Sequence, residues 1–296
     1  MTICMTSVED VRVEVKQVRQ RGCTIGLVPT MGALHAGHIS LIREARERTG
    51  FVVVSIFVNP TQFGPNEDFR RYPRPFEKDF QVCQQERVEL VFAPGADTMY
   101  PANFQSFVQV ERIQQYLEGA SRPGHFKGVA TVVLKLFNII RPDIAFFGQK
   151  DAQQARLIQH MARDLNLPVR LQICPTVRES DGLALSSRNQ YLDPEQRRNA
   201  SMLYKALQEA EQMILKGERS TAAIEKHVAA RIGSTRGAVL DYVAAVDSDS
   251  FEPIPHIEGD VIIALAVRFG QTRLIDNILV TSAALKSPPN HLLPAG

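Results

Sequence analysis

The sequence predicts an α/β protein with a Rossmann-like, doubly wound parallel sheet and a second, smaller α+β domain. Apolar runs of strand length alternate with amphipathic runs of helix length between residues 8 and 174, and this alternation is typical of a parallel sheet. Two strand-like runs near the C-terminus follow one another without a long helix between them. The length of 296 residues also suggests about two domains.

The alternation begins with a helix predicted over 8–20, where valines recur at helical spacing. An apolar run over 24–29, a helix over 39–48 and the β-rich run 51–58 then form a βαβ unit. The helices and strands predicted after this unit lie in turn over 76–86, 88–93, 129–140, 144–147, 151–165 and 169–174. About five strands therefore alternate with helices, as in a parallel sheet covered on both faces.

The character of the chain changes after Pro175, where a polar loop over 177–193 follows the last predicted strand. The elements expected beyond it are helices near 194–216 and 220–232 and strands over 239–246 and 261–267. We therefore predict one domain over 1–177 and a smaller one over 178–296. The tail over 286–296 contains three prolines and is expected to be frayed.

Charge and composition exclude several classes of protein. Lys and Arg total 34 against 32 Asp and Glu, a net charge of +2, which is too small for a general nucleic-acid or membrane-surface binder. The four cysteines form no zinc or redox motif. The N-terminus lacks the apolar core of a signal peptide, and the longest apolar runs fall short of the ~20 residues that span a membrane. We expect a cytoplasmic protein with no nucleic-acid or membrane partner.

The stretch 29–38 reads PTMGALHAGH and links the first apolar run to the next helix. A helix N-terminus at the carboxyl end of a parallel strand offers unpaired N–H groups to a phosphate. Gly32 and Gly37 allow a close approach to the backbone, and His35 and His38 add two donors. Two histidines three residues apart could instead ligate zinc, or be unrelated surface residues, and their spacing alone leaves these alternatives open.

Four further stretches carry polar groups at strand ends or in loops. They are FGQKD at 147–151, LSSRN at 185–189, NPTQF at 59–63 and SRPGHFKG at 121–128. Each has a plain structural alternative, such as a glycine turn, a polar linker or a basic loop. The sequence contains no P-loop and no GxGxxG fingerprint. Together the stretches predict an enzyme that binds nucleotide phosphates without a P-loop.

These stretches resemble the pantoate–β-alanine ligases, a family of the HxGH nucleotidyltransferase superfamily. The matching strings lie at 29–38, 54–63, 72–75, 121–154 and 175–189, in the family's order. The resemblance implies an ATP-dependent carbon–nitrogen ligase of pantothenate and coenzyme A biosynthesis. The enzyme would condense (R)-pantoate with β-alanine through a pantoyl adenylate, releasing pyrophosphate and then AMP.

The resemblance also implies site residues. His38 would be the catalytic proton donor, with His35, Lys150 and Arg188 on the phosphates. Gln62 and Gln154 would bind pantoate, and Gln62 would also place β-alanine. The implied ATP site comprises Met31, Gly32, Ala33, Leu34, His35, Ala36, Gly37, His38, Gly148, Gln149, Lys150, Asp151, Val177, Leu185, Ser186, Ser187 and Arg188.

The implied partners are small molecules: ATP as a substrate, pantoate, β-alanine and Mg²⁺. Asp79 is the candidate metal ligand, but Lys78 stands where some relatives have a second acid, so Mg²⁺ could instead be held by ATP and water. The resemblance further implies a homodimer. The domain over 1–177 would bind nucleotide and pantoate, and the domain over 178–296 would close over the active site.

Three competing hypotheses remain at this stage. A different HxGH adenylyltransferase would make a nucleotide cofactor and have no amine step. A non-catalytic regulator would bind ATP without releasing pyrophosphate. An RNA-binding role is conceivable because aminoacyl-tRNA synthetases share HxGH, but the net charge of +2 and the absence of a basic tract disfavour it.

Overall fold

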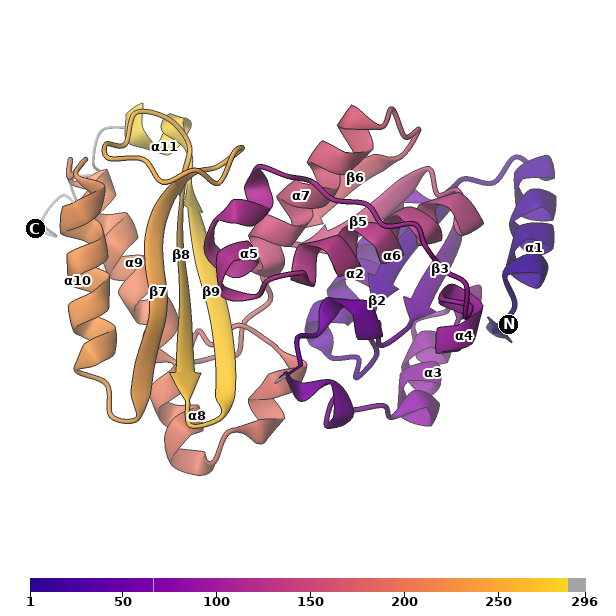
Figure 1. The fold of residues 1–296 in the computed structure, drawn as a ribbon, viewed down its shortest axis with the longest axis horizontal. Coiled ribbons are helices and arrows are strands. Elements are labelled where there is room, and N and C mark those ends of the chain that lie inside the picture. The colour runs from indigo at the N-terminus through magenta and orange to yellow at the C-terminus, as the bar shows by residue number, and fades with distance from the viewer. Residues whose placement is uncertain (66, 287–296) are drawn as a thin grey trace, which may run out of the picture. The chain divides into compact units, whose positions relative to one another are not determined.

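The computed structural model describes residues 1–65 and 67–286, so most of the tail predicted to be frayed lies outside the described residues. The chain forms two compact units (Figure 1). The first contains Met1–Val177 together with Leu185–Ser187, and the second contains Arg178–Ala184 and the residues from Arg188 onward. Three residues that we placed in the second domain thus cluster with the first. The predicted closure of residues 178–296 over the site stays a prediction.

The first unit is built on a six-stranded parallel sheet in the order β1-β4-β3-β2-β5-β6. Its strands are β1 (Ile3–Met5), β2 (Ile25–Thr30), β3 (Phe51–Ile56), β4 (Leu90–Phe92), β5 (Ile144–Gly148) and β6 (Arg170–Cys174). This sheet confirms the predicted Rossmann-like class. Strand β1 was not expected, because three residues at the edge beside β4 are too short to show a periodic pattern.

Helices cover both faces of this sheet. The helices of the first unit are α1 (Val8–Gln20), α2 (Ala36–Arg48), α3 (Phe76–Gln85), α4 (Ala96–Met99), α5 (Leu117–Ser121), α6 (His125–Ile140) and α7 (Ala152–Asp164). Leu41 and Ile42 of α2 and Cys83 of α3 pack with Val54 and Phe146 on one face. The right-handed crossovers through α1, α6 and α7 run in the opposite direction along the sheet, which places these helices on the other face.

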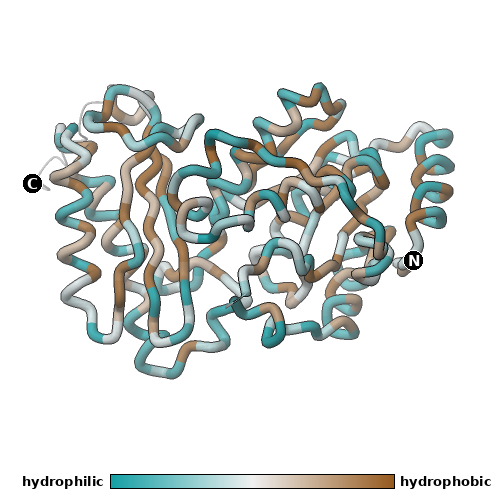
Figure 2. The backbone as a smooth tube through the Cα atoms, viewed as in Figure 1, coloured by the Kyte–Doolittle hydropathy of each residue, from teal (hydrophilic) through white to brown (hydrophobic). Residues whose placement is uncertain are grey.

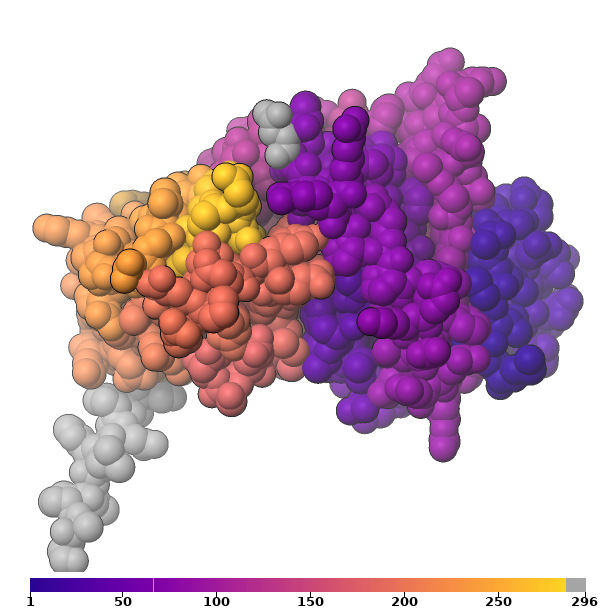
Figure 3. All heavy atoms as spheres, turned by 90° about the horizontal axis from the view of Figure 1, so that it is seen from below, coloured from indigo at the N-terminus to yellow at the C-terminus, as the bar shows by residue number. Residues whose placement is uncertain are grey.

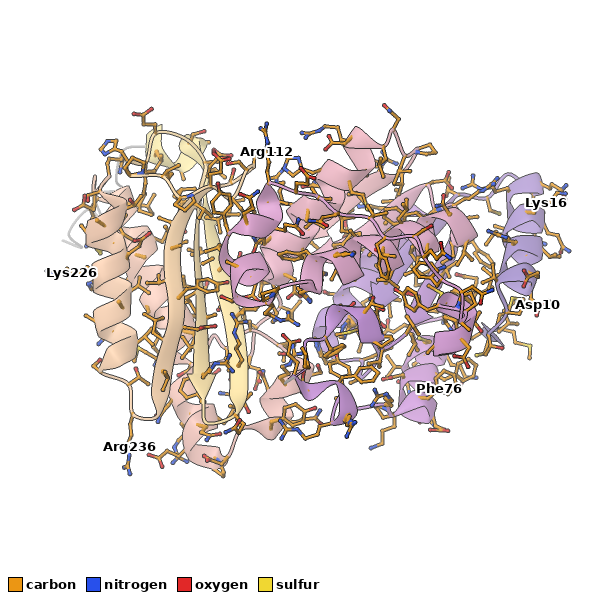
Figure 4. All side chains as sticks on the ribbon, in the orientation of Figure 1. Asp10, Lys16, Phe76, Arg112, Lys226 and Arg236 are labelled. Carbon is orange, nitrogen blue, oxygen red and sulfur yellow. The ribbon has the colours of Figure 1, made fainter. Side chains whose placement is uncertain are left out.

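Helix α1 illustrates why these segments are helical. Val11, Val15 and Val18 form its buried stripe, while Asp10 and Lys16 point away from the sheet (Figure 4). The Ser7 hydroxyl caps the helix by accepting the N–H of Asp10. The N-terminal residues, drawn in indigo, gather at one end of the first unit (Figure 3).

The sheet has one point where the strand order reverses. From β2 the chain moves through β3 and β4 in one direction, and β5 then pairs with the other side of β2 and leads to β6. Ligands of open α/β sheets bind beyond the carboxyl ends of the strands at such a point. The fold therefore predicts a ligand site where β2 and β5 end.

The second unit is a three-stranded antiparallel sheet in the order β7-β8-β9 with helices packed against it (Figure 1). Its strands appear mostly brown, hence hydrophobic, in Figure 2. Helices α9 and α10 supply most of the helical residues of its core, including Leu207 and Val228. The elements are α8 (Pro194–Ala200), α9 (Met202–Leu215), α10 (Thr221–Gly233), β7 (Ala238–Asp247), β8 (Val261–Phe269), β9 (Thr272–Val280) and α11 (Ser282–Lys286).

Two details of this unit differ from expectation. The single helix expected near 194–216 is divided at Ser201, whose hydroxyl donates to the Arg198 carbonyl. Strand β9 was not expected, because Asp276 and Asn277 interrupt its apolar pattern. Asp276 is buried against Arg178, with Oδ2 2.6 Å from Nη1. Among the described residues, no helix combines the length and apolar character that a membrane crossing requires.

Candidate active site

The two strongest sequence motifs lie side by side at the point where the strand order reverses. Residues 31–38 follow β2, and residues 148–151 lie at and just beyond the end of β5. Strands β2 and β5 pair in parallel, with Gly26 opposite Ile144. Because neighbouring parallel strands end at the same edge, the structure brings both motifs to one place.

The backbone of the loop after β2 has an unusual shape. Gly32 and Ala33 adopt φ angles of +82° and +51°, in the left-handed region. Asp79 holds this shape: its Oδ2 accepts the Ala33 N–H at 2.8 Å, and its Oδ1 accepts the Leu34 N–H at 2.7 Å. A Cβ at Gly32 would lie 2.8 Å from Asp79 Oδ2. The loop therefore requires glycine at 32 and a carboxylate at 79.

This arrangement bears on the predicted metal role of Asp79. The residue is 2% exposed, and each of its oxygens already accepts a main-chain N–H. Burial raises its pKa, and the two N–H groups oppose that shift. Within residues 1–65 and 67–286, no three His, Cys, Asp or Glu side chains gather into a site that would hold a metal ion by protein ligands alone. The residues around Asp79 do not fit a directly ligated magnesium ion.

Helix α2 begins with a capping box made of two histidines. His35 Nδ1 accepts the Gly37 N–H at 3.2 Å, and His38 Nδ1 accepts the His35 N–H at 3.3 Å. The two rings lie 4.1 Å apart. A ring nitrogen that accepts carries no hydrogen, so the hydrogen of each neutral imidazole is on Nε2. Both histidines thus keep an Nε2–H donor at the N-terminus of the helix.

The electrostatics of the site keep both rings neutral. Burial, followed by the Lys150 charge, lowers the pKa of His35 to about 4. Burial and the neighbouring His35 lower the pKa of His38 to about 3, with smaller contributions from Asp151 and Lys150. With this pKa, His38 is a hydrogen-bond donor rather than an acid near neutral pH. Its predicted role as a proton donor stays a prediction.

The loop after β5 brings a cation to the same edge. Residues 149–151 form a single 3₁₀ turn that leads into α7, and Lys150 Nζ lies 3.5 Å from Asp151 Oδ1. Lys150 and Asp151 shift the pKa values of both histidines in opposite directions, as charges close to the rings would do. The structure therefore unites the predicted residues of the two motifs.

Gln62 lies in the 3₁₀ turn after β3 (Pro60–Gln62), and its amide has a defined orientation. Asn59 Oδ1 accepts from the N–H and hydroxyl of Thr61, so Asn59 Nδ2 is the atom that faces Gln62 Oε1 at 3.1 Å. Asn59 Nδ2 also donates to the Gly128 carbonyl. Gln62 Nε2 then lies 2.8 Å from Met31 Sδ, beside the loop after β2. Gln62 thus presents its NH₂ group to this side of the site.

The other predicted pantoate residue lies in the first turn of α7. Gln154 is half-buried there, whereas its neighbour Gln153 is buried and has a structural role. Gln153 Oε1 accepts the Glu118 N–H, and its Nε2 donates to the carbonyls of Ile113 and Tyr116. The two adjacent glutamines therefore differ in their environment. Both polar atoms of the buried Gln153 bond to the main chain of other segments, whereas Gln154 is half-buried.

Part of the serine-containing loop reaches the start of α2. The Leu185 N–H donates to the Val177 carbonyl at 3.0 Å. A Cβ at Gly37 would lie 3.9 Å from Leu185 Cβ, and Ser187 Oγ lies 3.1 Å from Tyr72 Oη. Arg188 belongs to the second unit, so its predicted contact with phosphates stays a prediction.

Sequence reasoning did not foresee the part that Asp79 plays, nor the ordered cluster around Arg122 and His125. The stretch 121–128 had been noted only as a loop rich in donors. Arg122 and His125 both approach the carbonyl of Gln62, from a position 60 residues further along the chain. No local sequence pattern predicts such a contact, because the contact depends on how α6 packs against the turn after β3.

The fold and the site define a nucleotide-binding enzyme of the HxGH class. The sequence profile described as Pantoate-beta-alanine ligase matches residues 3–279. A pantothenate synthetase from Moorella thermoacetica is 54% identical over 276 residues, 93% of this chain and 98% of that protein. The chain belongs to the pantoate–β-alanine ligase family. It is an enzyme that condenses pantoate with β-alanine using ATP.

Solved structures agree with this assignment. The pantothenate synthetase of Thermus thermophilus has a TM-score of 0.88 and 43% identity, covering 93% of this chain and 98% of that one. The ligase of Francisella tularensis, solved with a β,γ-ATP compound and β-alanine, has a TM-score of 0.77 and 34% identity, covering 94% and 98%. The hypotheses of a non-catalytic regulator, an RNA binder and a cofactor-forming adenylyltransferase are therefore not favoured.

Proposed function

We propose that this enzyme activates pantoate as pantoyl adenylate before it joins β-alanine. A carboxylate oxygen of pantoate forms a bond to the α-phosphorus of ATP, and the bond to pyrophosphate breaks. The amine of β-alanine then attacks the acyl carbon, loses a proton, and AMP leaves. In both steps the nucleophile belongs to a substrate, so the protein positions groups and stabilises developing charge.

The observation that carries this proposal is the pair of Nε2–H donors at the N-terminus of α2. His35 and His38 are held there in the neutral tautomer by the capping box, beside Lys150. Charge grows on the phosphate oxygens as the α-phosphorus is attacked. Two fixed donors, a cation and a helix N-terminus are groups that stabilise such charge without rearranging.

The remaining site residues have proposed roles of binding. ATP is bound by residues 31–38, residues 148–151, Val177 and residues 185–188. The NH₂ group of Gln62 donates to pantoate, with Gln154 as its second polar contact. The orientation of the Gln62 amide by Asn59 supports this role, because it leaves a donor for a carboxylate or hydroxyl oxygen. Gln62 also helps to place β-alanine.

The proposed function also includes the magnesium ion and the oligomeric state. ATP enters with Mg²⁺ held by its own phosphates and by water, since Asp79 is committed to the loop. The enzyme acts as a homodimer, as the family resemblance implies, and in the cytoplasm, as the sequence features predict. The proposed dimer is tested by light scattering at several protein concentrations, where a monomeric mass throughout would contradict it.

The adenylate is tested with pantoate that carries heavy oxygen in its carboxylate. Transfer of one labelled oxygen to the phosphate of AMP would demonstrate that the carboxylate attacked the α-phosphorus. A label found instead in inorganic phosphate would indicate attack on the γ-phosphorus. That result would overturn the proposed intermediate while leaving the condensation itself intact.

A further inference from the structure

A cluster of charged and aromatic groups lies behind Gln62, outside the residues proposed to touch substrate. Arg122 precedes α6, and His125 is its first residue. Arg122 Nε and Nη2 each lie 2.7 Å from a different oxygen of Glu67, which is a bidentate pair. Arg122 Nη1 lies 3.1 Å from His125 Nε2, and His125 Nδ1 lies 2.8 Å from the Gln62 carbonyl oxygen.

The donors and acceptors of this cluster are fixed by chemistry. A carbonyl oxygen only accepts, so His125 Nδ1 carries a hydrogen and donates it to Gln62. A guanidinium only donates, so His125 Nε2 accepts from Arg122. The imidazole is therefore neutral, with its hydrogen on Nδ1. Burial and the Arg122 charge, which lower the pKa of His125 to about 4, agree with this state.

The guanidinium of Arg122 has little capacity left for a substrate carboxylate. Its side chain is 15% exposed, and its three nitrogens face Glu67, His125 and, at 3.4 Å from Nη2, the Gln62 carbonyl. Burial opposes ionisation of Glu67, yet the bonds to Arg122 hold the pKa of Glu67 below its usual value. Glu118 Oε2, 3.7 Å from Arg122 Nη1, adds a second carboxylate. The cluster is thus a set of ion pairs and hydrogen bonds directed at one main-chain carbonyl.

Next to this cluster, the backbone of α6 lies directly against the backbone of the turn after β3. Helix α6 approaches the turn after β3 so tightly that a Cβ at Gly128 would lie 2.3 Å from the Thr61 carbonyl oxygen. The Gly128 carbonyl in turn accepts from Asn59 Nδ2, the group that orients the Gln62 side chain. Gln62 is therefore held through its side chain by Asn59 and through its carbonyl by His125.

We propose that His125 and Arg122 are positioning residues for pantoate: they fix the Gln62 carbonyl and thereby hold the Gln62 amide where it binds the acid substrate. The proposal rests on the proposed role of Gln62. His125 supplies the hydrogen bond, Arg122 selects the tautomer that donates it, and Glu67 anchors Arg122. None of the three is among the residues proposed to touch substrate.

The test is a double-mutant cycle on the full-length enzyme, with the KM of pantoate, the KM of ATP and kcat as readouts. The variants are His125→Phe, which removes the donor, His125→Asn, whose amide nitrogen can replace Nδ1, Gln62→Ala, and the combined His125→Phe/Gln62→Ala variant. The same change at an exposed residue, His256→Phe, is the matched control. Glu67→Gln tests the cluster without altering the ring.

We expect His125→Phe to raise the pantoate KM about tenfold or more while the ATP KM changes less than about twofold. His125→Asn should restore most of the loss, and Glu67→Gln should raise the pantoate KM by about threefold. In the Gln62→Ala background, His125→Phe should have no further effect on the pantoate KM.

Two results would overturn the inference and can be told apart. A pantoate KM that is unchanged in His125→Phe, or raised equally with and without Gln62, would mean that His125 does not act through Gln62. A pantoate KM that is unchanged in Gln62→Ala itself would withdraw the proposed role of Gln62 and the inference with it. If His125→Phe fails to fold, the decisive variants are Arg122→Leu and Glu67→Gln. A normal pantoate KM in both would overturn the inference.

Discussion

The Asp79 carboxylate lies 2.7 Å from the main-chain nitrogen of Leu34 and accepts its N–H, although the two residues are 45 positions apart. With the matching bond to Ala33, this contact fixes the loop that begins helix α2. The position and direction of the two histidine donors depend on that loop. A buried acid whose oxygens bond to the main chain thus shapes the proposed phosphate site.

We predict that Asp79→Asn weakens ATP binding and lowers stability without changing the requirement for magnesium. The asparagine amide offers one acceptor where two N–H groups need one each, and a buried unsatisfied group costs about 1–3 kcal/mol. Thermal unfolding, the ATP KM and the half-saturating magnesium concentration are measured together. A marked rise in the magnesium requirement, with normal stability, would restore the predicted metal role of Asp79.

Gly32 should be more sensitive to substitution than a glycine of similar backbone conformation. Gly22 has a φ of +76° with open space around its Cβ position, whereas a Cβ at Gly32 would lie 2.8 Å from Asp79 Oδ2. Gly22→Ala therefore measures the backbone strain alone, about 1 kcal/mol. We predict that Gly32→Ala costs more in stability and also raises the ATP KM. Equal effects of the two variants would show that contact with Asp79 is unimportant.

His38→Ala and Lys150→Ala should each slow adenylate formation at least about tenfold, which corresponds to ~1.4 kcal/mol of barrier. Single-turnover measurements on the first half-reaction give this rate directly. His38→Gln is the matched variant for the histidine, because its amide nitrogen can replace an Nε2–H donor but cannot release a proton as an imidazolium does. A rate for His38→Gln above that of His38→Ala favours hydrogen-bond donation, and equal rates favour acid catalysis.

Three half-buried histidines of the first unit give the folding stability a pH dependence of known sign. Burial lowers the pKa of His35, His38 and His125 from 6.5 to about 4, about 3 and about 4. The unfolded chain binds protons first as the pH falls below 6.5, so the stability that the neutral rings contribute is lost between pH 6.5 and about 3. Urea unfolding should show this loss.

The contribution of one ring is isolated with His125→Asn, which cannot titrate in that range. We predict that the unfolding midpoint of this variant falls less than that of the wild-type enzyme as the pH is lowered. His256→Asn, at an exposed histidine, is the control and should behave as the wild type does. An identical pH dependence in all three proteins would contradict the burial of His125 as a neutral group.

The elements that the sequence predicted well are those with long, regular patterns. The valine run of β3 and the valine stripe of α1 follow from periodicity and burial alone. Strand β1 was missed because it is short, and β9 because Asp276 is buried by an ion pair with Arg178, 98 residues away. Such polar positions have no signature in the local sequence.

In the candidate site, too, local motifs could be predicted and contacts between distant segments could not. The motif at 29–38 is local, so its place between a strand and a helix could be predicted from the order of residues. The hydrogen bonds from Asp79 to that loop, and from His125 to Gln62, join segments that are distant in the chain. They depend on the packing of α3 and α6 against the sheet edge, and only the structure reveals them.

The most direct test of the proposed mechanism is exchange of labelled pyrophosphate into ATP, with Mg²⁺ present and β-alanine absent. We predict exchange that requires pantoate and that falls at least about tenfold in His38→Ala and Lys150→Ala. Adding β-alanine should then release AMP and form pantothenate. An absence of pantoate-dependent exchange in an enzyme that still forms pantothenate once β-alanine is added would contradict a pantoyl adenylate bound at the N-terminus of α2.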